Sequence, residues 1–263
     1  MLLSIKNRVF FGWSGKSYFL LFTLLFLFLF FNMTSIYAHK RDSLSVKEIE
    51  FIENKNQWEE HILFKAPLLG GAFFAEKNKI TFTFLNTAQL EAFQQAKLDP
   101  SAIHSGYINA SAYAIHFLNS NKKVKVTGKY PFTSYNNYFI GNDSTRWATK
   151  VSKFKQISYH DLYENIDLIF AQQGNYFKYE FIVKPNGNPQ KIKMKYEGVK
   201  GLSLSRGNLI VRTDNVQIVE IKPFAYQIKE NGDTVVVNCN FKIDKQTLSF
   251  STDSYDPTYT LII

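Results

Sequence analysis

The chain has 263 residues, a formal net charge of +9 and a single cysteine, Cys239. One cysteine excludes an intrachain disulfide, and a chain of this length can bury a full hydrophobic core without cross-links, so its stability must come from packing. Cys239 shares one side of an alternating apolar run with Val237 and Phe241. This pattern predicts a small buried side chain rather than a reactive thiol, which needs exposure and a cationic neighbour.

Residues 1–38 have the pattern of a secretory signal peptide. Lys6, Arg8 and Lys16 form a basic start without acidic residues, residues 18–31 are almost entirely apolar, and the segment ends at Ala38. The apolar run is shorter than the roughly 20 residues of a spanning helix, which favours cleavage after Ala38 over retention as a membrane anchor. We therefore expect an exported protein, located outside the cell, at its surface or in the periplasm. Loss of the three basic residues lowers the net charge from +9 to +6, and no stable membrane span remains.

A polar lead over residues 39–48 precedes a single β-rich module over residues 49–263. Strands are predicted at 61–66, 72–76, 79–85, 111–118 and 123–128, separated by glycine- and asparagine-containing turns. One short surface helix is predicted over residues 87–98, with Thr87 as its cap and Pro100 as the stop signal.

Residues 130–147 are too aromatic for a solvated linker and too rich in turn-forming residues for one strand. We expect a packed connection between two halves of the module that meet near residues 130–150. Tyr135, Tyr138 and Trp147 in this segment have two interpretations. They could stack on sugar rings, or they could brace the loop against a core, and the mixture with Asn137, Gly141 and Asn142 favours packing.

The stretch over residues 159–183 predicts the central β-hairpin. Apolar residues alternate with polar or outward-facing ones on both sides of a Gln-Gln-Gly-Asn turn, at Ile166, Leu168 and Phe170 and then at Phe177, Tyr179, Phe181 and Val183. Glu180 and Lys178 fall on the other face. One face of this hairpin is therefore expected to be buried.

Further strands are predicted at 192–196, 202–205, 209–213, 216–221, 224–229, 234–243, 247–251 and 259–263. Strands recur about every 8 to 12 residues and no helix is long enough for a parallel crossover, so we predict an all-β antiparallel sandwich of many short strands. The residues expected to be buried are Phe177, Tyr179, Phe181, Val183, Ile192, Met194, Tyr196, Val235, Val237 and Phe241. Those expected to be exposed are Lys178, Lys191, Lys193 and Lys195. Tyr259, Leu261 and Ile263 are expected to close the core as a last strand.

Asp161, Glu164 and Asp167 form a group of carboxylates that could suit glycoside hydrolysis, in which two carboxyl groups flank the scissile bond. They fall in a turn and a strand of the central hairpin, where Asp commonly bonds to backbone, and this favours a structural role.

Lys191, Lys193 and Lys195 project from one strand face, with Lys184 and Lys200 near its ends. This basic ridge could contact an anionic polysaccharide or an acidic neighbouring domain. The plainer interpretation is a solvated face whose lysines prevent edge pairing, and we favour it. Export argues against nucleic acid as a partner.

None of the five histidines lies in a spacing typical of a metal site, so we expect no metal and no cofactor. No nucleophile or phosphate-binding loop is recognisable, which indicates a protein that is not an enzyme.

A set of motifs resembles a known family. They are IENKNQW at 52–58, NYFIGND at 137–143 with Trp147, YENID at 163–167, YEFIV at 179–183, PNGNP at 185–189, KP at 222–223 and YQ at 226–227. In this order they resemble a domain of unknown function near the N-terminus of large secreted proteins of the Bacteroidetes kind. There it precedes SBBP-type propeller-like repeats, PKD-like modules and a C-terminal sorting domain.

The resemblance implies an exported, surface-associated module with the same β-rich fold, and it brings no catalytic residues. Asn56, Asn165 and Asn186 stand where the family tends to have glycine. Asparagine tolerates a positive φ better than other side-chain-bearing residues, so these turns are expected to survive. Asn188 replaces an aspartate of the family pattern, which argues against a cation site there.

The sequence thus favours a secreted or cell-surface module with a structural, adhesion or interaction role. Its partners would be cell-surface polysaccharide or neighbouring surface modules. The alternative is a carbohydrate-binding or carbohydrate-cleaving protein that uses Asp161, Glu164 and Asp167 with Tyr138 and Trp147. The residues expected to contact a ligand are Tyr138, Trp147, Lys191, Lys193 and Lys195.

Overall fold

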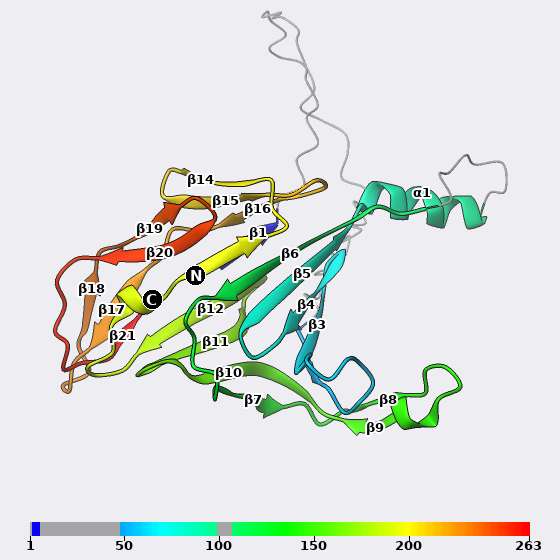
Figure 1. Ribbon diagram of the computed structural model, residues 1–263, viewed down its shortest axis with the longest axis horizontal. Helices are drawn as coiled ribbons and strands as arrows, with labels where there is room; N and C mark the ends of the chain where they lie inside the picture. The colour runs from blue at the N-terminus through cyan, green and yellow to red at the C-terminus, as the bar shows by residue number, and fades with distance from the viewer. Residues whose placement is uncertain (1, 6–47, 99–106) are drawn as a thin grey trace, which may run out of the picture. The chain divides into compact units, whose positions relative to one another are not determined.

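The computed structural model describes residues 2–5, 48–98 and 107–263 (Figure 1). The segments predicted as signal peptide and polar lead lie outside the described residues, except for residues 2–5 and Glu48. The strands before residue 150 are β1 (Leu2–Ile5), β2 (Phe51–Glu53), β3 (Phe64–Leu68), β4 (Gly71–Ala75), β5 (Lys79–Leu85), β6 (Ala110–Phe117), β7 (Lys125–Pro131), β8 (Asn136–Tyr138) and β9 (Ala148–Val151). The later strands are β10 (Lys153–Tyr163), β11 (Ile166–Gln173), β12 (Tyr176–Val183), β13 (Met194–Glu197), β14 (Gly201–Ser205), β15 (Asn208–Arg212), β16 (Gln217–Glu220), β17 (Ala225–Ile228), β18 (Thr234–Val237), β19 (Cys239–Asp244), β20 (Thr247–Thr252) and β21 (Leu261–Ile262). The helical elements are α1 (Thr87–Leu98) and the short 3-10 turns η1 (Ser144–Arg146) and η2 (Pro189–Lys191).

The predicted antiparallel all-β class is confirmed. Among the described residues, nineteen strands form one large, nearly closed sheet, and β8 and β9 form a small sheet of their own. The expected division of the strands between two packed sheets is not found, because hydrogen-bonded pairing continues from one part of the large sheet to the other.

Strand β10 is the reason for this continuity. One of its edges pairs with β7 from Phe154 to His160. The other edge pairs first with β2, at Lys153 and Phe154, and then with β11, from Gln156 onward. The sheet therefore forks at β10. One branch runs through β2, β3, β4, β5, β6, β13, β20 and β19, and the other runs through β11 and β12.

The two branches face each other across a core of aromatic rings. Phe73 on β4 lies with its ring centroid 5.1 Å from that of Phe170 on β11 and 5.0 Å from that of Phe177 on β12. Phe82 on β5 also meets Phe177, at 5.7 Å. Aromatic pairs at such separations add to the stabilisation from burial, about 0.5–1.5 kcal/mol each. The sequence alternation thus predicted correctly that one face of the β11–β12 hairpin is buried.

The central hairpin is confirmed, with β11 and β12 paired from Ile166–Val183 to Gln173–Tyr176. Both glutamines of the expected turn lie in the strand, and the loop consists of Gly174 and Asn175 alone. Gly174 has a φ of 57°, the left-handed conformation that such a tight connection requires. The buried face matches the alternation, since Phe177, Tyr179, Phe181 and Val183 are all buried.

Most of the burial expectations hold, and three are wrong. Ile192, Met194, Tyr196, Val237 and Phe241 are buried, as is Cys239. Val235 is 38% exposed, because the run expected as one strand over 234–243 breaks at Asn238. Within the described residues its first part, β18, pairs with β17 alone.

The other two differences concern Lys178 and Tyr259. Lys178 is half-buried because it pairs with Glu180 beside it on the outer face, at 2.7 Å. Tyr259 is half-buried and precedes the closing strand, whereas Leu261 and Ile263 are buried as expected.

The predicted helix is confirmed as α1, and it lies on the surface, with no buried residue from Thr87 to Lys97. Asn86 rather than Thr87 caps it, since the backbone N–H of Gln89 donates to Asn86 Oδ1 at 3.1 Å. Asparagine fills this position as well as threonine does.

Candidate functional site

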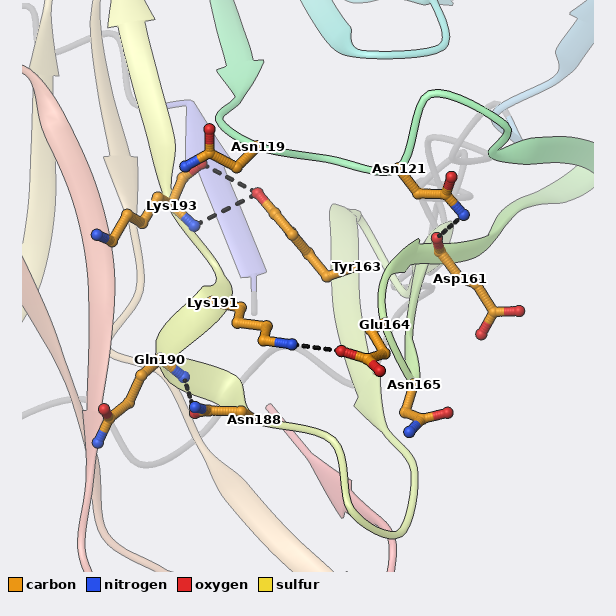
Figure 2. Close-up of a pocket in the computed structure, with 10 residues that line it drawn as sticks. All are labelled: Asn119, Asn121, Asp161, Tyr163, Glu164, Asn165, Asn188, Gln190, Lys191 and Lys193. Atoms are coloured by element: carbon orange, nitrogen blue, oxygen red, sulfur yellow. Dashed lines mark hydrogen bonds and ion pairs between the residues drawn. The ribbon is translucent and has the colours of Figure 1, made fainter.

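A polar cleft of about 870 Å³ lies where the β10–β11 turn faces the segment around η2 (Figure 2). Three stretches of chain supply its walls: the loop after β6, the β10–β11 turn, and the approach to β13. The ten lining residues are Asn119, Asn121, Asp161, Tyr163, Glu164, Asn165, Asn188, Gln190, Lys191 and Lys193. Five of the ten carry side-chain amides, which offer donors and acceptors together.

Backbone irregularities bring these side chains to the cleft. The pairing of β10 with β11 shifts register between Tyr159 and Tyr163, and Asp161 within that bulge has a φ of 49°. Asn165 in the turn and Asn119 across the cleft also have positive φ, at 58° and 57°. Bulges and left-handed residues commonly turn side chains toward a site, at a cost in backbone strain.

Hydrogen bonds hold the walls in place. The Tyr163 hydroxyl donates to the carbonyl oxygen of Lys193 at 3.0 Å, and this joins β10 to the approach to β13. Asn121 Nδ2 donates to the carbonyl oxygen of Asp161 at 3.2 Å. Asn188 Oδ1 accepts from the backbone N–H of Gln190 at 2.9 Å and starts η2. The cleft is therefore built from cross-linked segments.

Each carboxylate of the group predicted from the sequence has a lysine partner. Lys191 Nζ lies 2.5 Å from Glu164 Oε2, and this ion pair joins η2 to the β10–β11 turn (Figure 2). Lys184 Nζ lies 2.9 Å from Asp161 Oδ1 and 2.7 Å from Asp167 Oδ1. Asp167 also accepts the backbone N–H of Asp161, at 2.7 Å, which is the backbone role expected for it.

These ion pairs bear on chemistry. A hydrogen bond from Lys191, together with its charge, lowers the pKa of Glu164. A glycosidase acid needs a pKa raised toward neutrality so that it can deliver a proton. The environment of Glu164 shifts its pKa in the opposite direction.

The lysine ridge is divided by the fold. Lys191, Lys193 and Lys195 are exposed, as expected, and Ile192 and Met194 between them are buried. Lys191 and Lys193 line the cleft, whereas Lys195 is not among its lining residues.

The aromatic residues singled out in the sequence lie outside the cleft. Tyr138 ends β8 and is half-buried against Trp58, with ring centroids 5.6 Å apart. Trp147 is 44% exposed, meets Phe139 edge to face, and donates from Nε1 to the carbonyl oxygen of Gly141 at 3.2 Å. Tyr135 is 56% exposed and Phe139 is 62% exposed, so the expectation of a packed connection is wrong for this part of the segment. The β8–β9 sheet braces the segment and leaves part of its aromatic surface in solvent.

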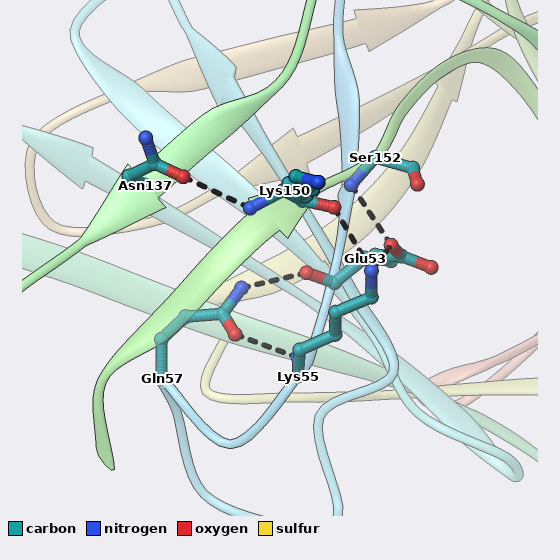
Figure 3. Close-up of polar contacts among 6 residues, drawn as sticks. All are labelled: Glu53, Lys55, Gln57, Asn137, Lys150 and Ser152. Atoms are coloured by element: carbon teal, nitrogen blue, oxygen red, sulfur yellow. Dashed lines mark hydrogen bonds and ion pairs between the residues drawn. The ribbon is translucent and has the colours of Figure 1, made fainter. Parts of the chain in front are cut away.

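The first family-like motif, over residues 52–58, has a structural role (Figure 3). Lys55 Nζ lies 3.0 Å from Glu53 Oε1 and donates to the carbonyl oxygen of Lys150 at 2.9 Å. Gln57 Nε2 donates to the carbonyl oxygen of Glu53, and Asn137 Oδ1 accepts the backbone N–H of Lys150. Lys55 therefore fastens the motif to β9, and Asn137 joins β9 to β8.

A buried carboxyl group, Glu220 on β16, was not singled out from the sequence. It is 1% exposed and accepts hydrogen bonds from Tyr196 Oη at 2.8 Å and from Tyr179 Oη at 2.9 Å. Burial raises its pKa to about 7, although the two tyrosine hydrogen bonds lower it. The ring of Tyr113 stacks on that of Tyr196 at 6.1 Å. The sequence did contain a signal for this residue. Side chains alternate between the two faces of a strand, so Glu220 lies on the same inward face as Ile218, two residues earlier.

The histidines that the structure describes have separate partners. His61 lies 4.0 Å from Glu76, His116 pairs with Glu197, and His160 contacts the Thr127 hydroxyl. The described part of the chain contains no group of three or more His, Cys, Asp or Glu side chains suited to a metal ion. Its one α-helix is too short and too polar to cross a membrane.

Comparison with known proteins assigns a family and no activity. Neither a curated protein nor a solved structure matches the chain. A family model described as a domain of unknown function, DUF7948, matches residues 51–263. That range takes in every strand from β2 to β21, so the protein belongs to the DUF7948 family.

Proposed function

We propose that the protein is an exported, non-catalytic adhesion or interaction module that binds a polar glycan in the amide-lined cleft. The observation that carries the proposal is the lining itself. Amides from Asn119, Asn121, Asn165, Asn188 and Gln190 surround a space of about 870 Å³. Sugar hydroxyls each donate and accept hydrogen bonds, and amides can do the same. A volume of several hundred Å³ is typical of ligand sites.

The charges in the cleft favour recognition over cleavage. Lys191 pairs with Glu164 and lowers its pKa, and Asp161 and Asp167 both pair with Lys184. Lys193 remains at the rim, where it can meet an acidic sugar of a cell-surface polysaccharide.

Export completes the proposal. The basic and apolar pattern of residues 1–38 supports passage through the general secretory route to the periplasm, the cell surface or the medium. The likeness to modules that precede SBBP-type repeats and PKD-like domains supports a place beside other surface modules, as part of a larger adhesive assembly.

A glycan array probed with the exported protein tests this function. The matched variants are Lys193→Glu, at the cleft, and Lys195→Glu, two residues along the same exposed face and outside the cleft. We expect Lys193→Glu to lose binding to acidic glycans and Lys195→Glu to retain it. An array without hits contradicts the proposal, and so does equal loss of binding in both variants.

A further inference from the structure

Strand β18 has an edge without a partner and without the usual protection against pairing. One edge pairs with β17, and no backbone hydrogen bond joins the other edge to any segment that the structure describes. Thr234–Val237 contains no lysine, proline or bulge, and Val235 and Val236 are 38% and 62% exposed. Natural proteins shield such edges, because an exposed strand edge can pair with a strand of another chain. β18 is therefore open to a further strand.

A groove of about 440 Å³ follows this strand. Residues 235–237 line one side of it, and residues 254–256, from the segment after β20, line the other side (Figure 1). The three valines offer an apolar wall, and the facing segment Ser-Tyr-Asp offers a polar one. The space beside β18 can thus receive side chains of an added strand.

Exposed carboxylates mark both ends of β18. Asp233 directly precedes the strand, and Asp253 donates its backbone N–H at 3.0 Å to the carbonyl oxygen of Asn238, the residue directly after the strand. Asp256 and Lys229 both line the groove between these ends. If two copies of β18 paired with each other, Asp233 of one copy would approach either Asp253 or Asp233 of the other, and like charges would repel. An occupant with basic residues avoids this repulsion.

The chain presents a basic strand edge elsewhere on the same sheet. β7 pairs with β10 along one edge, and its other edge has no strand partner in the described ranges. Lys125 and Lys129 lie on β7 and are exposed, and Lys122 and Lys123, also exposed, come shortly before it. Lysines on an edge strand repel other basic edges, but they suit an edge that ends in carboxylates. β7 is therefore complementary in charge to β18.

The spacing of the charges agrees with such a pair. Lys125 and Lys129 are about 13 Å apart along β7, and Asp233 and Asn238 at the two ends of β18 are about 17 Å apart. Lysine side chains are long and flexible, so they cover the difference. In either direction of pairing, one lysine approaches each acidic end, and opposite charges across a strand pair stabilise it.

We propose that the β18 edge of one molecule binds the β7 edge of a second copy of this chain, so that copies join head to tail. Because the two edges differ, an assembly of any length keeps one free β18 edge and one free β7 edge, and further copies can add. A contact through one strand pair is small and transient, so it forms where molecules are concentrated, as at a surface. This self-assembly goes beyond the proposed glycan-binding function and does not depend on it.

Charge reversal tests the pairing. Sedimentation velocity of the exported protein is measured up to about 1 mM, because small contacts bind weakly. The acidic ends are reversed in Asp233→Lys/Asp253→Lys, and the basic edge is reversed in Lys125→Glu/Lys129→Glu. We expect wild type to form a concentration-dependent series of oligomers, and each double variant to associate at least about tenfold more weakly. A mixture of the two double variants should restore the series, since every β18 edge then finds a β7 edge of opposite charge.

A matched pair of single variants tests the edge itself. Val236→Lys, on β18, should abolish association, whereas Leu204→Lys, at an exposed position of β14, should leave it unchanged. All the substituted positions are exposed, and equal urea midpoints show that the variants fold.

Three results would overturn the proposal. The first is a wild-type protein that stays monomeric up to about 1 mM. The second is association that the β18 variants lose and Lys125→Glu/Lys129→Glu retains, because β18 would then have another occupant. The third is a mixture of the folded double variants that stays monomeric. Glycan binding is measured separately on the array, so its failure leaves the self-assembly result in place.

Discussion

The substitution Glu220→Gln should change how the stability of the protein depends on pH. Burial raises the pKa of Glu220 in the folded protein to about 7, above the ordinary value of 4.5. Between these two values the unfolded chain releases the proton while the folded protein keeps it. The free energy of unfolding therefore falls as pH rises from 4.5 to 7, by about 3 kcal/mol for this group. Below pH 4.5 both states are protonated and the group contributes no penalty.

Glutamine has the same shape and cannot ionise, so this part of the pH dependence should vanish in the variant. Urea unfolding followed by tryptophan fluorescence, at steps from pH 4.5 to 8, gives the free energy of unfolding for both proteins. Because other groups cancel in the difference, the stability of the variant relative to wild type should rise by about 3 kcal/mol over this range. Glu230→Gln, at an exposed position, is the control and should give a flat difference. If the difference in the free energy of unfolding between Glu220→Gln and wild type is also independent of pH, Glu220 does not keep its proton in the folded protein at these pH values.

Three further predictions concern stability. Phe181→Asp places a charge at a fully buried position of β12 and should prevent soluble folding. Lys193→Asp, on an exposed face, should express and melt like wild type. Equal melting of both variants would contradict the assignment of buried and exposed faces to these strands. Deletion of residues 261–263 removes two buried side chains and should lower the free energy of unfolding by about 3–6 kcal/mol. The measurement is the urea midpoint, which should fall. An unchanged midpoint would show that the strand is not part of the core. Burial raises the pKa of Cys239 to about 11, so a thiol reagent at pH 8 should label it only as fast as the protein unfolds, and rapid labelling of the native protein would contradict its packing.

The parts of the fold that the sequence predicted are those with a regular period. The β11–β12 hairpin alternates without interruption, and α1 covers the predicted range Thr87–Leu98, although Asn86 rather than Thr87 caps it. Strand β10 was missed although it is the longest strand described. Its alternation is broken by the bulge around Asp161, and its first residue, Lys153, is buried beside Glu50. The sandwich was predicted from the spacing of the strands, and that spacing does not show that β10 joins the two branches.

The candidate cleft was predictable only in part. Glu164 and Lys191 were singled out for their chemistry, and the structure brings them together. The amides of Asn119 and Asn188 come from loops with no periodic pattern, so only the folded chain shows that they face one cleft. The tolerance of asparagine for positive φ was predicted correctly, with Asn56, Asn165 and Asn186 at 78°, 58° and 64°.

The fork at β10 also imposes an order on folding. Phe51 and Ile52 pair with Phe154 and Lys153, partners roughly 100 residues later, whereas β10, β11 and β12 pair with their neighbours in the chain. A chain that emerges from a ribosome or crosses a membrane N-terminus first presents β2 long before β10 is available. During that interval one edge of β2 has no partner, and its apolar residues are exposed to other chains. The attachment of the first branch to the rest of the sheet at β2 must therefore wait until β10, in the middle of the sequence, has been made.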